Sequence, residues 1–272
     1  MSRPAAFYRP NRPLLVYAVL YLAFLYGPVA LLPVFSFNDS IYISFPLKGF
    51  TTQWYAQMFA DEAMHSALWN SIKVGIVAAV VATILGIFGA KAVTRFRIRG
   101  VKPVLGIVML PLVIPPIIMG VALLILLSQS GITLSLATVT IGHILICVPF
   151  SIVTLMASFE GFDRSMEEAA ADLGDNAWWS FWRVTFPMVL PGIVASLLLC
   201  FTISFDEFIM AFFLAGTEQT LPIFIYGQLR FPQKLPGVLA LGAVIISVTF
   251  VVVFFAQWLR GRAVTLPDAQ EE

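Results

Sequence analysis

Charged residues are scarce in this chain of 272 residues, of which Asp, Glu, Lys and Arg make up 11% and hydrophobic residues 60%. A soluble globular domain carries about 25% charged residues. Because so few side chains favour water, most of the surface must meet an apolar environment, which excludes an ordinary soluble protein. The formal net charge is only +1, so the sequence gives no reason to expect a nucleic-acid partner.

Cysteine and histidine are almost absent, with two residues of each. Cys147 and Cys200 lie inside apolar runs, so we expect no disulfide framework. His65 and His143 are far apart and no CxxC pattern accompanies them, so we expect no metal site and interpret both as ordinary polar contacts. The sequence also lacks a GxxxxGK[ST] phosphate loop and any Ser/His/Asp or paired-acid hydrolase pattern. We therefore expect neither enzyme activity nor a bound cofactor.

Long apolar segments, by contrast, are abundant. A spanning helix needs about 20 mostly apolar residues, and six windows qualify: roughly 14–37, 71–94, 103–128, 133–158, 188–215 and 236–259. Arg3, Arg9 and Arg12 precede the first window as in a signal peptide, but its apolar stretch is longer than a signal-peptide core and no A-x-A-like cleavage site follows. We expect a retained first span, and an all-α membrane protein with six transmembrane helices.

Lysine and arginine are distributed unevenly, and this bias sets the orientation of membrane proteins. Twelve of them lie on one side of the predicted spans: in the N-terminal tail, in and beside the loop 95–102, around Glu168, and in the C-terminal tail. Four lie on the other side, namely Lys48, Lys73, Arg230 and Lys234. Because the positive side is cytoplasmic, we predict that both termini and the Glu168 loop lie in the cytoplasm.

The remaining organisation is simple. We predict one integral membrane domain over residues 1–272 with a core of about 66–258, a short helix near 51–60, and a tight external hairpin near 128–132. The apolar face of the short helix would consist of Trp54, Tyr55, Met58 and Phe59. The third span holds Pro111, Pro115, Pro116 and Gly120, so we expect it to kink and to face protein rather than lipid, for packing alone or as part of a pathway.

The segment of about 160–187 is partly polar and rich in tryptophan, between two apolar runs. Ser165 and Glu168 have the spacing of a capping box. Gly174 follows the expected helix at the position where a residue in the left-handed conformation, usually glycine, ends it. Asp175 or Asn176 would start a second short helix carrying three tryptophans, which Pro187 would stop. The pattern predicts a helix-turn-helix at the membrane face, either a docking surface for a soluble partner or an interfacial anchor.

The string Glu168-Ala-Ala-x3-Gly174-x9-Val184-x-Phe186-Pro187 resembles the EAA loop of the transmembrane subunits of bacterial ATP-binding cassette (ABC) importers. The resemblance implies the type I importer permease fold in a bacterial inner membrane. It implies that an ABC ATPase dimer, which hydrolyses ATP in place of this chain, contacts Glu168, Ala169, Ala170 and Gly174. It further implies a second homologous permease subunit and a periplasmic substrate-binding protein.

Three more strings, 36–38, 49–55 and 204–208, are similar to those of spermidine/putrescine permeases of the C type. This similarity implies a small cationic amine as substrate; related permeases move opines, 4-aminobutyrate and other small amines. Polyamine permeases often have Asp-Asp in the fifth span, where this chain has Asp206-Glu207. That departure leaves the substrate open.

Asp206 and Glu207 fall inside the predicted fifth span, where an ionisable group normally faces a cavity or a partner. They would guide a cationic amine, or form an intersubunit salt bridge or a cap; the resemblance favours Asp206 for the pathway. Trp54 would offer a cation–π face to an ammonium or simply anchor its loop. Two other classes stay open: an ion-coupled secondary transporter using the two acids, and a membrane anchor or signalling subunit.

Overall fold

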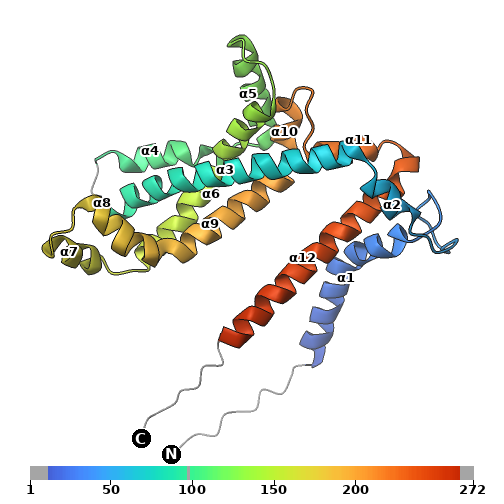
Figure 1. Ribbon diagram of the computed structural model, residues 1–272, viewed down its shortest axis with the longest axis horizontal. Coiled ribbons are helices and arrows are strands. Elements are labelled where there is room, and N and C mark those ends of the chain that lie inside the picture. Colours follow the sequence, from blue (N-terminus) through green and yellow to red (C-terminus); the bar gives the residue numbers. More distant parts are fainter. Residues whose placement is uncertain (1–11, 97–98, 264–272) are drawn as a thin grey trace, which may run out of the picture. The chain divides into compact units, whose positions relative to one another are not determined.

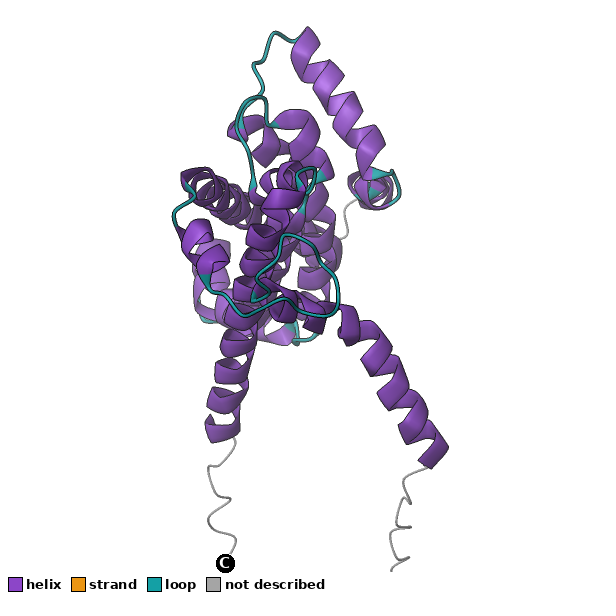
Figure 2. Ribbon diagram, turned by 90° about the vertical axis from the view of Figure 1, so that its right-hand side faces the viewer, coloured by secondary structure: helices purple, strands orange, loops and turns teal. Residues whose placement is uncertain are grey.

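The computed structural model describes residues 12–96 and 99–263, which form helices joined by loops (Figure 2). An isolated antiparallel bridge joins Asn38 and Phe50. The all-α class is therefore confirmed. The chain separates into two compact units, one of residues 1–61 and 227–272 and the other of residues 62–226. Arg3, Arg9 and Arg97, which the charge count uses, lie outside the described residues.

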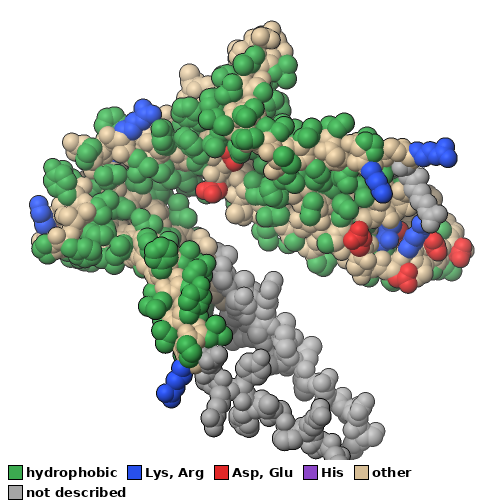
Figure 3. Space-filling model, turned by 180° about the vertical axis from the view of Figure 1, so that it is seen from behind, with side chains coloured by type: hydrophobic (Ala, Val, Ile, Leu, Met, Phe, Trp, Pro, Cys, Tyr) green, Lys and Arg blue, Asp and Glu red, His purple; other side chains and the backbone are tan. Residues whose placement is uncertain are grey.

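Five helices in the described part of the chain are long and apolar enough to cross a membrane, and six if one bent pair is counted as a span. The five are Arg12–Ser36, Glu62–Arg95, Leu136–Glu160, Ala177–Asp206 and Pro232–Val251. Their outward faces carry large apolar side chains such as Phe24 and Phe88, which are 83% and 69% exposed. Figure 3 shows these hydrophobic side chains over most of the visible surface. Such a surface is suited to lipid rather than water.

The first unit contains α1 (Arg12–Ser36), α2 (Gln53–Phe59), the 3-10 turn η3 (Pro232–Lys234) and α12 (Leu235–Ala263). Helices α1 and α12 pack together, and α2 packs against α12 (Figure 1). The helix predicted near 51–60 is confirmed, but its buried face is smaller than expected. Trp54 and Met58 are buried, whereas Phe59 is 59% exposed.

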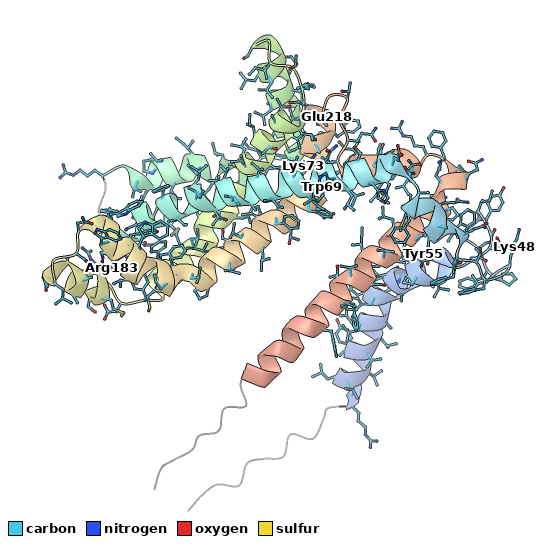
Figure 4. All side chains as sticks on the ribbon, in the orientation of Figure 1. Lys48, Tyr55, Trp69, Lys73, Arg183 and Glu218 are labelled. Carbon is cyan, nitrogen blue, oxygen red and sulfur yellow. The ribbon has the colours of Figure 1, made fainter. Side chains whose placement is uncertain are left out.

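The loop after α1 is closed by polar contacts with α2. The Ser36 hydroxyl lies 2.6 Å from the hydroxyl of Tyr55, which Figure 4 labels, and the Trp54 indole donates to the Asn38 carbonyl at 2.9 Å. The Asn38 side chain accepts the Lys48 backbone N–H at 2.9 Å. Two of the strings that resembled polyamine permeases, 36–38 and 49–55, therefore hold one loop in shape.

The second unit is built around α3 (Glu62–Arg95), α6 (Leu136–Glu160) and α9 (Phe186–Asp206), which pack against one another. Small residues bring these helices close: a Cβ at Gly86 would collide with Ser151. The Ser196 hydroxyl then bonds both Thr83, at 3.0 Å, and Ser151, at 2.8 Å. Close approach and interhelical hydrogen bonds are what hold helices together where both solvent and core are apolar.

Two expectations about buried side chains are confirmed in the same unit. Cys147 and Cys200 are free thiols, each within about 3.6 Å of the other's carbonyl oxygen. His143 is buried and its Nδ1 lies 2.7 Å from the Ser204 hydroxyl, an ordinary polar contact between α6 and α9.

The third predicted span is broken rather than kinked. Residues 101–129 form α4 (Val101–Val108), the 3-10 turn η1 (Leu110–Leu112) and α5 (Pro116–Gln129), with a bend of 102°. Pro115 and Pro116 explain the break, because neither offers a backbone N–H to continue a helix. After α5, Gly131 lies in a left-handed turn and residues 132–135 lead to α6, so the predicted turn is present; its external position stays a prediction. The chain also forms α10 (Ile209–Leu214), which packs on α5 and α6, and α11 (Leu221–Gln228).

Candidate functional site

The segment of about 160–187, which resembles an EAA loop, is called the coupling loop below. Its first helix, α7 (Ser165–Asp172), does not begin as predicted. The capping box is wrong: Ser165 is the first residue of the helix, and its N–H donates to the Asp163 carboxylate at 2.9 Å. Glu168 instead lies 3.1 Å from Arg164, in an exposed pair. The hydrogen bond from the Ser165 backbone holds the pKa of Asp163 below its usual range. The cap therefore lies two residues earlier than the sequence pattern indicated.

The turn after α7 is formed as predicted. Gly174 has φ +95°, a left-handed conformation that side chains with a Cβ rarely adopt. The N–H groups of Gly174 and Asp175 return to the carbonyls of Ala171 and Ala170 at 2.9 and 3.0 Å. This pairing satisfies the last carbonyls of the helix and reverses the chain.

Asn176, one of the two predicted caps, starts α8 (Ala177–Ser180) by accepting the N–H groups of Trp178 and Trp179 at 3.1 and 3.0 Å. Pro187 does not stop this helix, contrary to expectation. A π-helical turn, η2 (Phe181–Thr185), joins α8 to α9, so that Ala177–Asp206 runs as one helix of 30 residues. Pro187 follows this π-helical turn closely, so its missing N–H falls where the regular hydrogen-bond ladder is already interrupted.

The four predicted coupling residues do not all face outward. Glu168, Ala169 and Gly174 are exposed, whereas Ala170 is 8% exposed. Leu173, which the sequence reasoning did not single out, is 90% exposed at the tip between α7 and α8. The loop therefore presents an apolar tip beside an exposed carboxylate, and several acidic and basic side chains gather at this end of the unit (right-hand end of Figure 3). Binding of an ATPase by these residues stays a prediction.

Glu167 fixes the loop to the spans, and the sequence reasoning missed it. One carboxylate oxygen accepts the Thr185 hydroxyl at 2.5 Å and the other lies 3.3 Å from Nε of Arg95. Arg95, at the end of α3, also donates to the Phe159 and Phe162 carbonyls at 2.8 and 3.2 Å and lies over the Phe162 ring. These contacts join α7 to α3, to the end of α6 and to the start of the long helix.

A second ion pair and a ring contact stabilise the outer side of the loop. Arg183, labelled in Figure 4, binds Asp175 at 2.8 Å and lies over the Trp179 ring, 5.0 Å from its centroid. Because Arg183 is 62% exposed, this pair contributes little to stability and mainly orients the tryptophan.

Asp206 and Glu207 do not lie within a continuous fifth span, as had been expected. α9 ends at Asp206, and Glu207 has an extended backbone with φ −73° and ψ 112°. The Glu207 carboxylate accepts the N–H groups of Ile209 and Met210 at 2.9 and 3.1 Å and so caps α10. Asp206 is exposed and forms no hydrogen bond or ion pair within the described residues. The two acids therefore have different surroundings.

Trp54 lies in the first unit, 8% exposed, with its indole N–H bonded to Asn38. This contact gives it a role in closing its loop. Its proposed contact with an ammonium group stays a prediction.

Two permease proteins of Escherichia coli are similar in sequence to this chain. The chain is 34% identical over 209 residues to the "Spermidine/putrescine transport system permease protein PotC" of Escherichia coli (strain K12), covering 76% of this chain and 79% of that one. It is 34% identical over 224 residues to the "Putrescine transport system permease protein PotI" of the same strain, covering 79% of each chain.

The fold has a solved counterpart in a bacterial ABC transporter that imports the acidic polysaccharide alginate, with a TM-score of 0.74 at 20% identity over 92% of this chain and 98% of that one. At this identity the likeness concerns the fold alone. Residues 82–264 match the model of the family described as the binding-protein-dependent transport system inner membrane component. The chain belongs to that family and is a multi-pass permease subunit of the type I ABC importer class.

Proposed function

We propose that this permease moves a small cationic amine of the spermidine/putrescine class into the cell, with Asp206 as its contact. The observation that carries the proposal is the exposed carboxylate of Asp206, which lacks a partner among the described residues while Glu207 is occupied as a helix cap. A carboxylate beside hydrocarbon is costly unless it meets a cation or water. The two similar proteins named for putrescine support the same class of substrate.

The position of Asp206 along its helix suits an entry site. The 21 residues of α9 correspond to about 30 Å of helix, which is the thickness of the hydrocarbon core. If Phe186 lies at the cytoplasmic border, Asp206 lies at the opposite, periplasmic border. An amine released by a periplasmic binding protein would meet this carboxylate first.

The coupling loop supplies the contact with the ATPase in this proposal. Leu173 and Ala169 form an apolar, closely approachable tip, and Glu168 adds a charge beside it. Closure of the ATPase dimer would move α7, and the contacts of Glu167 would pass that movement to α3 and to the long helix. A ligand shifts such an equilibrium only by its different affinity for the two states, so the loop must bind the closed dimer more tightly.

The assembly proposed here has a bacterial inner-membrane location, both termini in the cytoplasm, a second homologous permease and a periplasmic binding protein. The excess of Lys and Arg on one side of the spans supports the orientation. Labelling of a Leu173→Cys variant tests it directly, because this position is the most exposed of the loop. A membrane-impermeant maleimide should label it from the cytoplasmic side only, and labelling from the periplasm would refute the orientation.

The substrate contact is tested by uptake of labelled putrescine into proteoliposomes containing the complete importer. Asp206→Asn should raise the KM for the amine about tenfold or more, the loss expected for a hydrogen bond between charged groups. Glu207→Gln is the matched control, because its amide oxygen still accepts the two N–H groups that cap α10. Unchanged uptake by Asp206→Asn, together with loss of uptake by Glu207→Gln, would contradict the assignment.

The same preparation separates the alternatives. A panel of putrescine, spermidine, 4-aminobutyrate and an opine identifies the amine by competition for uptake. Uptake that continues with an inactive ATPase and stops when an uncoupler is added would indicate an ion-coupled secondary transporter instead.

A further inference from the structure

An apolar groove of about 650 Å³ runs along α3, between this helix and the segment formed by α8, η2 and the start of α9. Its α3 wall includes Val80, Ile84 and Phe88, and its other wall includes Trp178 and Trp182. These five side chains are between 42% and 69% exposed, so the groove is open. An apolar groove of this size needs an apolar occupant.

One end of the groove carries a cation. Lys91 lines it there, with its ammonium 5.0 Å from the centroid of the Phe181 ring. Lys91 also lines the neighbouring pocket beside Arg95 and Arg164, but those two arginines are paired with Glu167 and Glu168. Lys91 has no carboxylate within ion-pair distance among the residues described. The charge at the groove's end is therefore available to an anion.

The dimensions of the groove match one leaflet of a bilayer. From Val80 to Lys91 the wall follows about three turns of α3, or roughly 16 Å, close to half of a 30 Å hydrocarbon core. Trp182 contacts the Phe181 ring that lies under Lys91, and Trp178 contacts Trp182 in turn. Tryptophan gathers at the level of the lipid headgroups. The groove thus extends from headgroup level toward the bilayer centre.

We infer that this groove binds one anionic phospholipid, with an acyl chain along α3 and its phosphate at Lys91. The apolar walls suit an acyl chain. The unpaired Lys91 ammonium complements the negative charge of a headgroup and lies at headgroup depth. A bound lipid would touch α3 and α8 together, close to the contacts through which Glu167 holds the coupling loop. The inference does not depend on the identity of the transported substrate.

Native mass spectrometry of the full chain, purified with the subunits that accompany it, tests the preference after incubation in equal amounts of phosphatidylglycerol and phosphatidylcholine. The wild type should retain phosphatidylglycerol preferentially. Lys91→Gln should weaken that preference about five-fold, the effect expected of one lysine near an anionic headgroup. Lys91→Arg keeps the charge and should keep the preference. Lys102→Gln, an exposed lysine on α4 away from the groove, is the matched control and should behave as wild type.

A photo-crosslinking residue at position 84 identifies the occupant. Attachment of phospholipid to that position supports the inference, whereas attachment to a polypeptide would show that another subunit fills the groove and would overturn it. An equal phosphatidylglycerol preference in wild type and Lys91→Gln would also overturn it. Ile84→Trp, which fills the groove, should release the lipid; if this variant misfolds, Lys91→Gln decides the question alone.

Discussion

Glu167 offers the sharpest test of how the coupling loop is fixed to the spans. Its carboxylate and the Arg95 guanidinium are 17% and 10% exposed and lie 3.3 Å apart. Nε of Arg95 is not aligned for a hydrogen bond, so the attraction between the two groups is mainly that of opposite charges. Glu167→Ala would leave Arg95 largely buried without its counter-charge, held only by two backbone carbonyls and the Phe162 ring.

The expected cost follows from this geometry. Unit charges 3.3 Å apart attract by about 5 kcal/mol at an effective dielectric constant of 20, and desolvation offsets most of that gain. Removing one partner of a buried pair costs about 3–5 kcal/mol. Because two carbonyls still bind Arg95, we expect Glu167→Ala to lower the free energy of unfolding by about 2–3 kcal/mol. Glu168→Ala removes an exposed pair and should change it by about 0.5 kcal/mol or less.

Two measurements check this prediction. Unfolding by sodium dodecyl sulfate in mixed micelles gives the stability of each variant, and uptake per ATP hydrolysed in proteoliposomes gives the coupling. Glu167→Ala should lower both, because α7 is no longer held to α3. In a double-mutant cycle with Arg95→Met, the two losses should be less than additive by about 1 kcal/mol or more. Equal behaviour of Glu167→Ala and Glu168→Ala in both assays would refute the reasoning.

Three further changes test separate parts of the second unit. Asn176→Ala removes the cap of α8 and should cost about 1 kcal/mol, seen as faster proteolysis of the loop, whereas Asn176→Asp should restore resistance. Gly86→Ala should destabilise the helix packing by about 1–3 kcal/mol through its clash with Ser151, and Ser151→Gly in the same chain should relieve it; no relief would count against the contact. The Ser165 N–H lowers the pKa of Asp163 in the folded protein. The contribution of this carboxylate to the free energy of unfolding is therefore complete above about pH 4 and is lost as the pH falls below the usual aspartate range. At this low pH, amide hydrogen exchange at the start of α7 should become faster in the wild type but not in Asp163→Asn.

In the coupling loop, a turn or a helix end was predictable where the type of a single residue determines the backbone conformation. Gly174 is the residue that tolerates φ +95°, and Asn176 is a preferred N-cap, so the turn and the second helix followed from residue type. Ser165 shows the limit. Its spacing from Glu168 fits a capping box, but the Ser165 N–H is taken by the Asp163 carboxylate and Glu168 pairs with Arg164 instead.

The ends of the long helix were not predictable from pattern alone. Pro187 usually marks a boundary, yet a π-helical turn before it lets the helix continue, because that turn places the proline where no N–H donor is needed. At the other end the apolar sequence continues past Asp206, so hydropathy placed the span end near residue 215. Only the capping of α10 by Glu207 reveals the break.

Glu167 was missed for a related reason. Its partners, Arg95 and Thr185, are 72 and 18 residues away in sequence, and nothing local indicates which of two adjacent glutamates turns inward. The resemblance of the loop to known importers predicts an ATPase partner but could not show how the loop is held.

The two acidic doublets of the second unit follow one physical rule. Adjacent side chains point in different directions, about 100° apart for Glu167 and Glu168 on α7 and across the end of α9 for Asp206 and Glu207, so one carboxylate of a doublet can face the protein while the other faces away. The Glu167 and Glu207 carboxylates form hydrogen bonds inside the protein, whereas Glu168 and Asp206 are exposed. In a surface this apolar, an exposed charge is costly and is kept only where it meets another molecule or water. Neutralising an inward member should therefore reduce stability, and neutralising an outward member should reduce binding of a partner or substrate while leaving stability unchanged.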